Sequence, residues 1–127
     1  MAQIQSKLAI FAMEKYDGYV LVDEDQNSLP AKRLNEKEIL TTLQLAKQLF
    51  SNLTNISPTW PTLIFSLGLT QETPTASCHE VNLVYSVYLE RLVSVKDQKC
   101  KWVKISELTK DFLDYNVILE LGKKRYV

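Results

Sequence analysis

Residues 80–92, with the sequence EVNLVYSVYLERL, decide the fold class of this chain. Polar side chains alternate there with apolar ones, which are Val81, Leu83, Tyr85, Val87 and Leu89. In an extended chain, a period of two residues places alternate side chains on opposite faces. The stretch therefore predicts a long β-strand with one buried face.

A second stretch, residues 36–53, has the periodicity of a helix. Its apolar side chains recur every three or four residues and form one stripe: Ile39, Leu40, Leu43, Ala46, Phe50 and Leu53. Asn35 is the expected N-cap, with Glu38 in the capping-box position. Polar residues and Pro58 are expected to end the helix after Leu53. The residues expected to face a sheet are Ile39, Leu43, Ala46 and Phe50.

Four shorter runs predict further strands, at residues 8–13, 19–22, 62–69 and 101–105. Asp17-Gly18, between the first two runs, is a strong hairpin signal. Residues 71–77 are expected to form a loop. Ser106 is expected to cap a helix, and residues 111–123 carry a helical apolar pattern. The order β-β-α-β-β-β-α predicts an α+β fold, with a sheet packed against helices.

The length and composition fit one compact domain over residues 1–127. Lysine and arginine together number 15, as do aspartate and glutamate, so the formal net charge is zero. This balance excludes a generally basic nucleic-acid-binding protein. Because aromatic residues also lie near the predicted loops, we expect self-association as a homodimer.

No stretch approaches 18 consecutive apolar residues, so we expect no membrane-spanning segment. The apolar run at residues 8–13 is too short for a secretory signal. Together these observations predict a cytoplasmic protein. Cys78 and Cys100 lack any metal-ligand spacing and are expected to be reduced structural thiols.

The order of these elements, with Leu29-Pro30 and the run from Trp102 to Leu108, resembles a Nudix domain. Such domains open with a strand hairpin and a loop ending Leu-Pro-Gly-Gly, followed by the catalytic helix and more strands. The resemblance covers almost the whole chain. It implies a mixed β-sheet packed between helices, an α/β/α sandwich. It also implies hydrolysis of a diphosphate linked to another moiety, with divalent metal held by glutamates on one helix face.

The sequence box of that family is degenerate here. Its two glycines fall on Ala31 and Lys32, and its first glutamate falls on Glu38. Without a gap, the remaining acid positions fall on Lys47, Phe50 and Ser51; with a one-residue insertion, they fall on Gln48, Ser51 and Asn52. Mg²⁺ needs oxygen ligands, preferably anionic ones. We therefore expect no catalytic residue, no metal site and no cofactor, and the only residual box acids are Glu36 and Glu38.

These observations lead us to interpret the chain as a Nudix-fold protein that has lost its hydrolase chemistry and binds a nucleotide or a protein. Candidate phosphate contacts are Lys32 and Arg33, and candidates for stacking on a base are Tyr19, Trp60 and Tyr85. His79 is the only histidine. We expect it to be a surface or capping residue, because general base catalysis also needs an orienting partner.

Two alternatives remain open. The chain is an atypical Nudix hydrolase acting on a nucleoside diphosphate derivative, with Mg²⁺ held by Glu36, Glu38 and the loop Asp23 to Asp25. Otherwise it is a small α+β interaction domain unrelated to the Nudix family. A metal-dependence assay separates the hydrolase from the binding module. The backbone structure tests whether the chain is instead a domain unrelated to the Nudix family.

Overall fold

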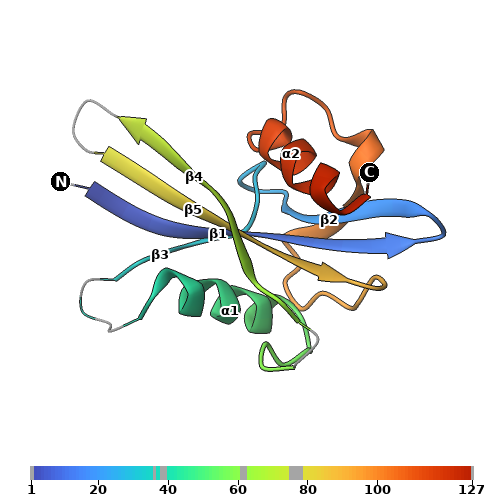
Figure 1. The fold of residues 1–127 in the computed structure, drawn as a ribbon, viewed down its shortest axis with the longest axis horizontal. Coiled ribbons are helices and arrows are strands. Elements are labelled where there is room, and N and C mark those ends of the chain that lie inside the picture. The colour runs from blue at the N-terminus through green and yellow to red at the C-terminus, as the bar shows by residue number, and fades with distance from the viewer. Residues whose placement is uncertain (1, 36, 38–39, 61–62, 75–78, 127) are drawn as a thin grey trace.

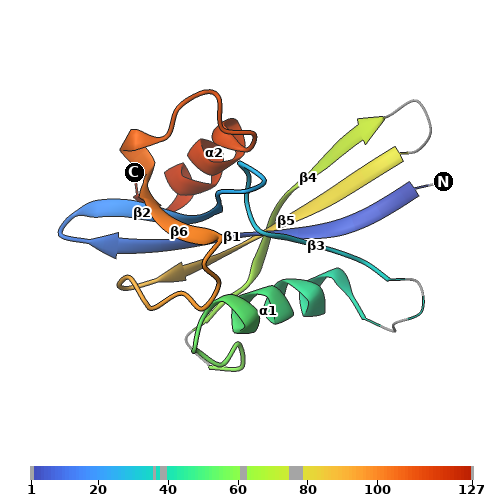
Figure 2. The same ribbon diagram turned by 180° about the vertical axis from the view of Figure 1, so that it is seen from behind.

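A computed structural model describes residues 2–35, 37, 40–60, 63–74 and 79–126 of the chain. Two helices lie on opposite faces of one mixed sheet (Figures 1 and 2). The elements, in chain order, are β1 (Ala2–Glu14), β2 (Asp17–Asp23), β3 (Ala31–Arg33), α1 (Thr42–Leu53), β4 (Ser66–Pro74), β5 (His79–Leu89), β6 (Cys100–Lys104), the 3-10 helix η1 (Ile105–Glu107) and α2 (Tyr115–Tyr126). The predicted α+β sandwich is confirmed. Among the described residues, no helix is long and apolar enough to cross a membrane.

Strand β1 is the centre of the sheet. The strand order is β4-β5-β1-β2-β6 over the described residues, and β3 pairs with β1 off this path. β1 and β5 are parallel along eleven paired positions, from Ala2 beside His79 to Ala12 beside Leu89. The other pairs are antiparallel, with β3 on residues 5–7 of β1 and β2 on residues 11–14. Residues 5–7 and 11–12 of β1 are therefore paired on both edges of the strand.

Strand β3 is an element that the sequence analysis does not predict. Its flanks are held by backbone hydrogen bonds from the N–H of Leu8 to the C=O of Pro30, at 2.9 Å, and from the N–H of Leu34 to the C=O of Ile4, at 2.8 Å. Three residues are too few to show a periodicity. Pairing with β1 alone defines this strand.

Helix α1 begins at Thr42, and the predicted start near Glu36 is wrong. Its N-cap is Thr41, whose Oγ1 accepts the N–H of Gln44 while the Gln44 side chain accepts the N–H of Thr41. This reciprocal pair satisfies two backbone donors at the helix start, so Asn35 is not the cap. Three residues named in the predicted helix start lie outside the described residues: Glu36, Glu38 and Ile39.

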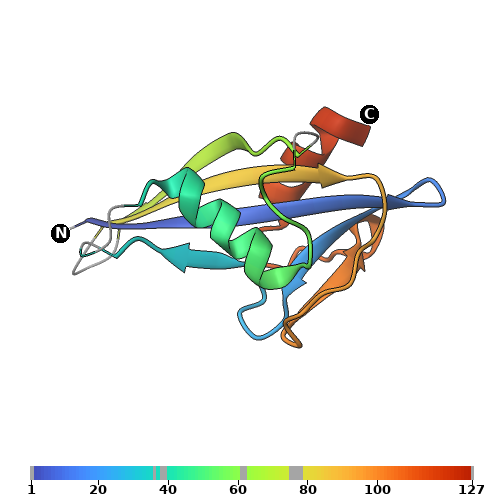
Figure 3. The same ribbon diagram turned by 90° about the horizontal axis from the view of Figure 1, so that it is seen from below.

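The apolar face of α1 packs on the sheet, as predicted. Ala46 and Phe50 are fully buried, and Leu43 is partly buried against the same cluster. Phe50 meets Phe65 edge-on, with ring centroids 5.3 Å apart. The helix runs along the sheet in the view of Figure 3 and ends at Leu53, as predicted.

Helix α2 covers the opposite face of the sheet, where the buried apolar side chains include Ala9, Phe11, Val84, Ile118 and Leu121. The ring of Phe11 stacks on that of Tyr88 with centroids 5.1 Å apart. A Cβ at Gly68 of β4 would collide with the side chain of Leu121. Glycine at this position therefore permits α2 to approach the edge of the sheet closely.

Other predicted boundaries differ from the structure. Gln71 belongs to β4 and not to a loop, because its pairing with Asn82 of β5 extends the strand. Ser106 lies inside η1, whose N-cap is Lys104, and it does not cap a helix. α2 starts at Tyr115, later than predicted, because residues 110–114 form turns.

A buried ion pair joins β1 to the start of α2. Lys7 Nζ lies 2.9 Å and 3.2 Å from the two carboxylate oxygens of Asp114, and the side chains are 7% and 1% exposed. Oδ2 of Asp114 also accepts the N–H of Leu29 at 2.9 Å. The C=O of Asp114 accepts the N–H of Ile118 at 2.9 Å. This carboxylate therefore connects β1, the segment before β3 and α2.

Replacing Phe50 by Ala is expected to lower the free energy of unfolding by roughly 3–5 kcal/mol, because it leaves a cavity between α1 and the sheet. Urea denaturation followed by circular dichroism measures the change. Ile64→Ala is the control, since Ile64 is 71% exposed, and is expected to change stability by less than about 0.5 kcal/mol. A Phe50→Ala variant as stable as the parent would contradict the packing described.

Lys7→Met is expected to lower the free energy of unfolding by roughly 3–5 kcal/mol, because the Asp114 carboxylate stays buried without its cation. The double variant Lys7→Met/Asp114→Asn is expected to regain most of this loss, since a neutral amide oxygen still accepts the N–H of Leu29. Urea unfolding of the two single variants and the double variant gives the coupling free energy between the two side chains. Losses that simply add would show that the two charges do not interact.

Candidate functional site

The outer side of α1 carries amides, hydroxyls and a lysine. Gln48 Oε1 accepts a hydrogen bond from Lys32 Nζ at 3.0 Å, which ties β3 to the helix. Ser51 Oγ donates to the C=O of Gln48 at 3.1 Å. Lys47 Nζ lies 5.9 Å from the centre of the Phe65 ring, within cation–π range. The helix sequence TLQLAKQLFSNL contains no aspartate or glutamate.

The acidic loop that follows β2 is engaged in internal contacts. Asp23 Oδ1 accepts the backbone N–H groups of Asp25 and Gln26, at 3.0 and 3.2 Å. Two surface ion pairs engage the other carboxylates: Glu24 with Lys101 at 3.4 Å and Asp25 with Lys99 at 4.0 Å. Over the described ranges, no three His, Cys, Asp or Glu side chains gather into a group that could hold a metal ion.

The two candidate phosphate contacts lie on opposite faces of the sheet. Lys32 pairs with Ser6 and reaches α1, whereas Arg33 pairs with Gln5 on the face of α2. Neighbouring residues of a strand alternate between faces. Lys32 and Arg33 are therefore not placed to contact one phosphate together.

The three candidates for base stacking come from different parts of the molecule. Tyr85 of β5 is buried under α1, and its hydroxyl lies 2.8 Å from Thr42 Oγ1. Trp60 is 57% exposed in the segment after α1. Tyr19 lies near the start of β2. In this structure the Tyr85 ring fills the core beneath the helix.

Two side chains carry acid–base or nucleophilic chemistry: Cys100 is buried at the start of β6, and His79 lies at the start of β5. Burial, followed by the nearby carboxylates of Asp23, Asp97 and Asp25, raises the pKa of the Cys100 thiol to about 12. The thiol is therefore protonated at neutral pH, whereas a nucleophilic cysteine needs the thiolate. His79 Nε2 lies 3.5 Å from Glu72 Oε2 at the surface.

A row of polar side chains crosses four adjacent strands on the face that α2 occupies. Strand pairing places Gln5 of β1 between Arg33 of β3 and Asn82 of β5. Gln71 of β4 lies on the other side of Asn82. Residues directly opposite one another in a sheet share a face. The strand segments that carry the row extend past α2 (Figure 1).

Asn82 stands out within this polar row. It is 5% exposed, and its Oδ1 accepts no hydrogen bond from any described residue. The neighbouring Gln5 instead donates from Nε2 to Glu80 Oε1 at 2.9 Å. Leaving a buried amide oxygen without a partner costs about 1–3 kcal/mol. Such an acceptor is suited to a ligand that presents an N–H donor.

The sequence analysis does not identify this polar row. Only Asn82 lies in a predicted strand, where it looks like a solvent-facing residue; Gln71 falls in a predicted loop, and Gln5 and Arg33 fall in no predicted strand. The four residues are brought together only by the parallel pairing of β1 with β5 and by the short strand β3. No signal within one segment could have found them, because the row depends on the register between strands.

Solved structures of several known proteins share this architecture. The chain is similar to the NUDIX domain of Shewanella oneidensis NrtR, solved with ADP ribose, at 16% identity and a TM-score of 0.67 over 98% of this chain and 88% of that one. It is similar to a C. elegans Ap4A hydrolase at 13% identity and a TM-score of 0.73, over 95% of this chain and 96% of that one. The chain has the Nudix fold.

Another similar structure with this fold is the C-terminal domain of mouse MUTYH, solved in complex with human PCNA. The identity is 14% and the TM-score 0.62, over 96% of this chain and 90% of that domain. No protein-family model and no curated protein matches the sequence. At identities of this size, the shared property is the Nudix fold alone.

The alignment of the Nudix sequence box proposed above falls partly on β3 and α1. Under the one-insertion alignment, Gln48 and Asn52 take two of the acid positions, one turn apart on the same side of the helix. Lys32 takes the position of the second glycine. Its ammonium group reaches Gln48 Oε1. A lysine from the glycine position therefore contacts a residue at an expected metal-ligand position.

Proposed function

We propose that this chain is a Nudix-fold binding module without pyrophosphohydrolase activity, and that its ligand is a nucleotide. The observation that carries this proposal is the Lys32–Gln48 hydrogen bond on the outer side of α1. It replaces a carboxylate, which a metal needs, with a neutral amide beside a cation. Lys47, on the helix itself, is a second positive charge in addition to that of Lys32 from β3.

Electrostatics disfavours a divalent cation on this helix. Mg²⁺ binds through oxygen ligands, usually one or two carboxylates together with substrate phosphates. A unit charge about 4 Å from a lysine is repelled by about 1–4 kcal/mol, depending on the local dielectric, and a divalent ion is repelled more strongly. Without a carboxylate on α1, no attraction offsets this repulsion.

The polar row offers a place for a nucleotide on the other face of the sheet. Amide side chains such as Asn82, Gln5 and Gln71 match the donors and acceptors along a purine edge. Arg33 lies at the exposed end of the row, where a guanidinium can bind a phosphate. The similar NUDIX domain of NrtR was solved with ADP ribose, which supports a nucleotide as the ligand class.

Addition of 10 mM Mg²⁺ or Mn²⁺ is expected to shift the melting temperature by less than about 2 °C. An intact site with a dissociation constant of ~0.1 mM would add about 2.7 kcal/mol at ~10 mM metal. That would raise the melting temperature by roughly 8–15 °C for a domain of this size. Differential scanning fluorimetry measures the shift. A large shift, together with metal-dependent phosphate release from nucleoside diphosphate derivatives, would support the atypical hydrolase instead.

Restoring acids to α1 tests whether the helix face is assigned correctly. The variant Gln48→Glu/Ser51→Glu/Asn52→Glu, combined with Lys32→Ala, is expected to gain a metal-dependent rise in melting temperature of several degrees. Lys32 is removed because it would otherwise neutralise the new carboxylate at position 48. The control keeps Lys32, and its metal response is expected to be smaller. Equal responses with and without Lys32 would contradict the assigned geometry.

Asn82→Leu is expected to weaken binding of ADP-ribose at least tenfold without lowering stability. The substitution removes an unpaired buried amide oxygen, so the free energy of unfolding is expected to stay level or to rise by about 1–3 kcal/mol. Isothermal titration calorimetry measures the affinity for ADP-ribose, and urea unfolding measures the stability. The matched control is Asn55→Leu, an exposed position after α1. If the two variants bind ADP-ribose equally well, the ligand does not lie on the polar row.

A further inference from the structure

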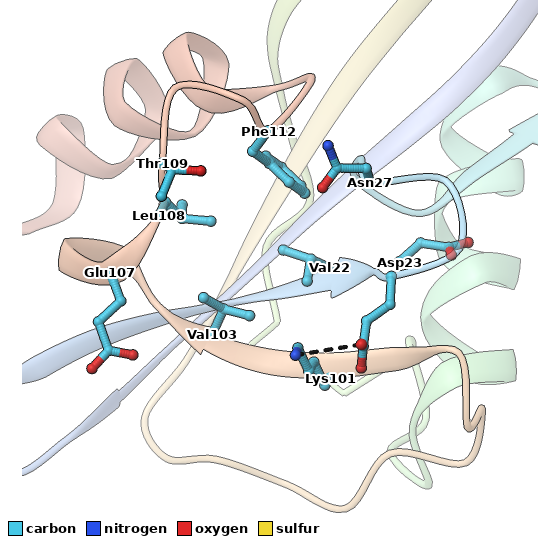
Figure 4. A pocket seen from close by; sticks show the side chains of 10 residues that line it. Val22, Asp23, Asn27, Lys101, Val103, Glu107, Leu108, Thr109 and Phe112 are labelled. Atoms are coloured by element: carbon cyan, nitrogen blue, oxygen red, sulfur yellow. Dashed lines mark ion pairs between the residues drawn. The ribbon is translucent and has the colours of Figure 1, made fainter.

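A recess lies between β2, β6 and the segment that leads into α2, and it encloses about 230 Å³ (Figure 4). Its floor is apolar, and four side chains point toward its centre: Val22, Val103, Leu108 and Phe112. Val22 and Phe112 are 4% and 7% exposed and belong to the core under α2. The recess is therefore an opening onto a firmly packed part of the molecule.

The rim of the recess is acidic. Asp23, Glu24 and Glu107 line it, against the single cation Lys101. Lys101 is already paired with Glu24 at 3.4 Å, as the dashed line in Figure 4 marks. The lining groups therefore sum to a formal charge of −2, which attracts a cationic partner.

The walls of the recess are held in place before any partner arrives. Asn27, on one wall, donates from Nδ2 to the C=O of Asp111 at 3.0 Å, and its own C=O accepts the N–H of Leu113 at 3.1 Å. Asn27 has a φ of 51°, a left-handed conformation that these bonds hold. Such preorganisation lowers the entropy cost of binding.

We propose that this recess is a docking site for a protein partner and receives one apolar side chain flanked by lysine or arginine. A volume of about 230 Å³ is below the roughly 300–1,000 Å³ of sites for drug-sized ligands, so the recess fits one side chain better than a nucleotide. The apolar floor takes the side chain, and Asp23 and Glu107 take the flanking cations.

Capped tripeptides provide the probes, and methyl resonances of Val22, Val103 and Leu108 report binding by NMR titration. Acetyl-Lys-Phe-Lys-amide is expected to shift these methyls saturably, with a dissociation constant on the order of 1 mM. The same peptide with glutamates in place of lysines, and the peptide with alanine in place of phenylalanine, are each expected to bind at least tenfold more weakly. Methyls of the exposed Leu67 on β4 are expected not to move.

Two variants of exposed rim residues locate the peptide. Thr109→Trp fills the mouth of the recess and is expected to abolish the shifts, while Glu107→Gln is expected to weaken binding about threefold. The matched control Glu72→Gln removes a carboxylate from the exposed surface of β4 and is expected to leave binding unchanged. Circular dichroism confirms that each variant is folded.

Several results would overturn the proposal. Equal binding of the acidic peptide would reject charge complementarity, and equal binding of the alanine peptide would reject the apolar anchor. Binding of free phenethylamine as tightly as the lysine peptide would show that the recess takes small amines. The variant Asn82→Leu separates the recess from the proposed nucleotide site. It is expected to leave peptide binding intact. If this variant loses peptide binding, the peptide lies on the polar row and not in the recess.

Discussion

The buried ion pair between Lys7 and Asp114 holds together the segments on which both proposed sites depend. Asp114 accepts hydrogen bonds from the Lys7 ammonium and from the N–H of Leu29, while its own C=O accepts the N–H of Ile118 in α2. The pair thus sets where α2 starts relative to β1 and β3. A buried charge needs a partner, so this arrangement has few alternatives once the sheet has formed.

The two proposed sites lie on different sides of the Lys7–Asp114 ion pair. Gln5 lies two residues before Lys7 on the same face of β1, and it is the member of the polar row beside Asn82. On the chain leading to Asp114, Asp111 and Leu113 are bonded to Asn27, which lines the acidic recess. The same ion pair therefore lies between the polar row, which carries amides and Arg33, and the acidic recess, and these two surfaces suit different classes of ligand.

Helix α1 packs on the sheet with one side and is bonded to β3 on the other. Its inner side buries Ala46 and Phe50 against the sheet, and its outer side is tied to β3 through Lys32 and Gln48. A metal-binding helix must keep several carboxylates close together and unneutralised, which costs stability unless the cation is bound. The amides and the single lysine of α1 avoid the repulsion between neighbouring carboxylates.

The sequence by itself determined the layers of this protein, because local periodicity reports which side of each element is buried. The two-residue period of β5 and the stripe through Ala46 and Phe50 were enough for the α+β class. The order of the elements, with Leu29-Pro30 and the run from Trp102 to Leu108, was enough for the Nudix fold. The tertiary structure alone decided the start of α1 at Thr42, the strand β3, the Lys7–Asp114 pair and the row through Asn82. Each of these depends on partners from elsewhere in the chain or on a choice between equally suitable local caps. Register and long-range pairing arise only when the strands meet, so no single stretch of sequence encodes them.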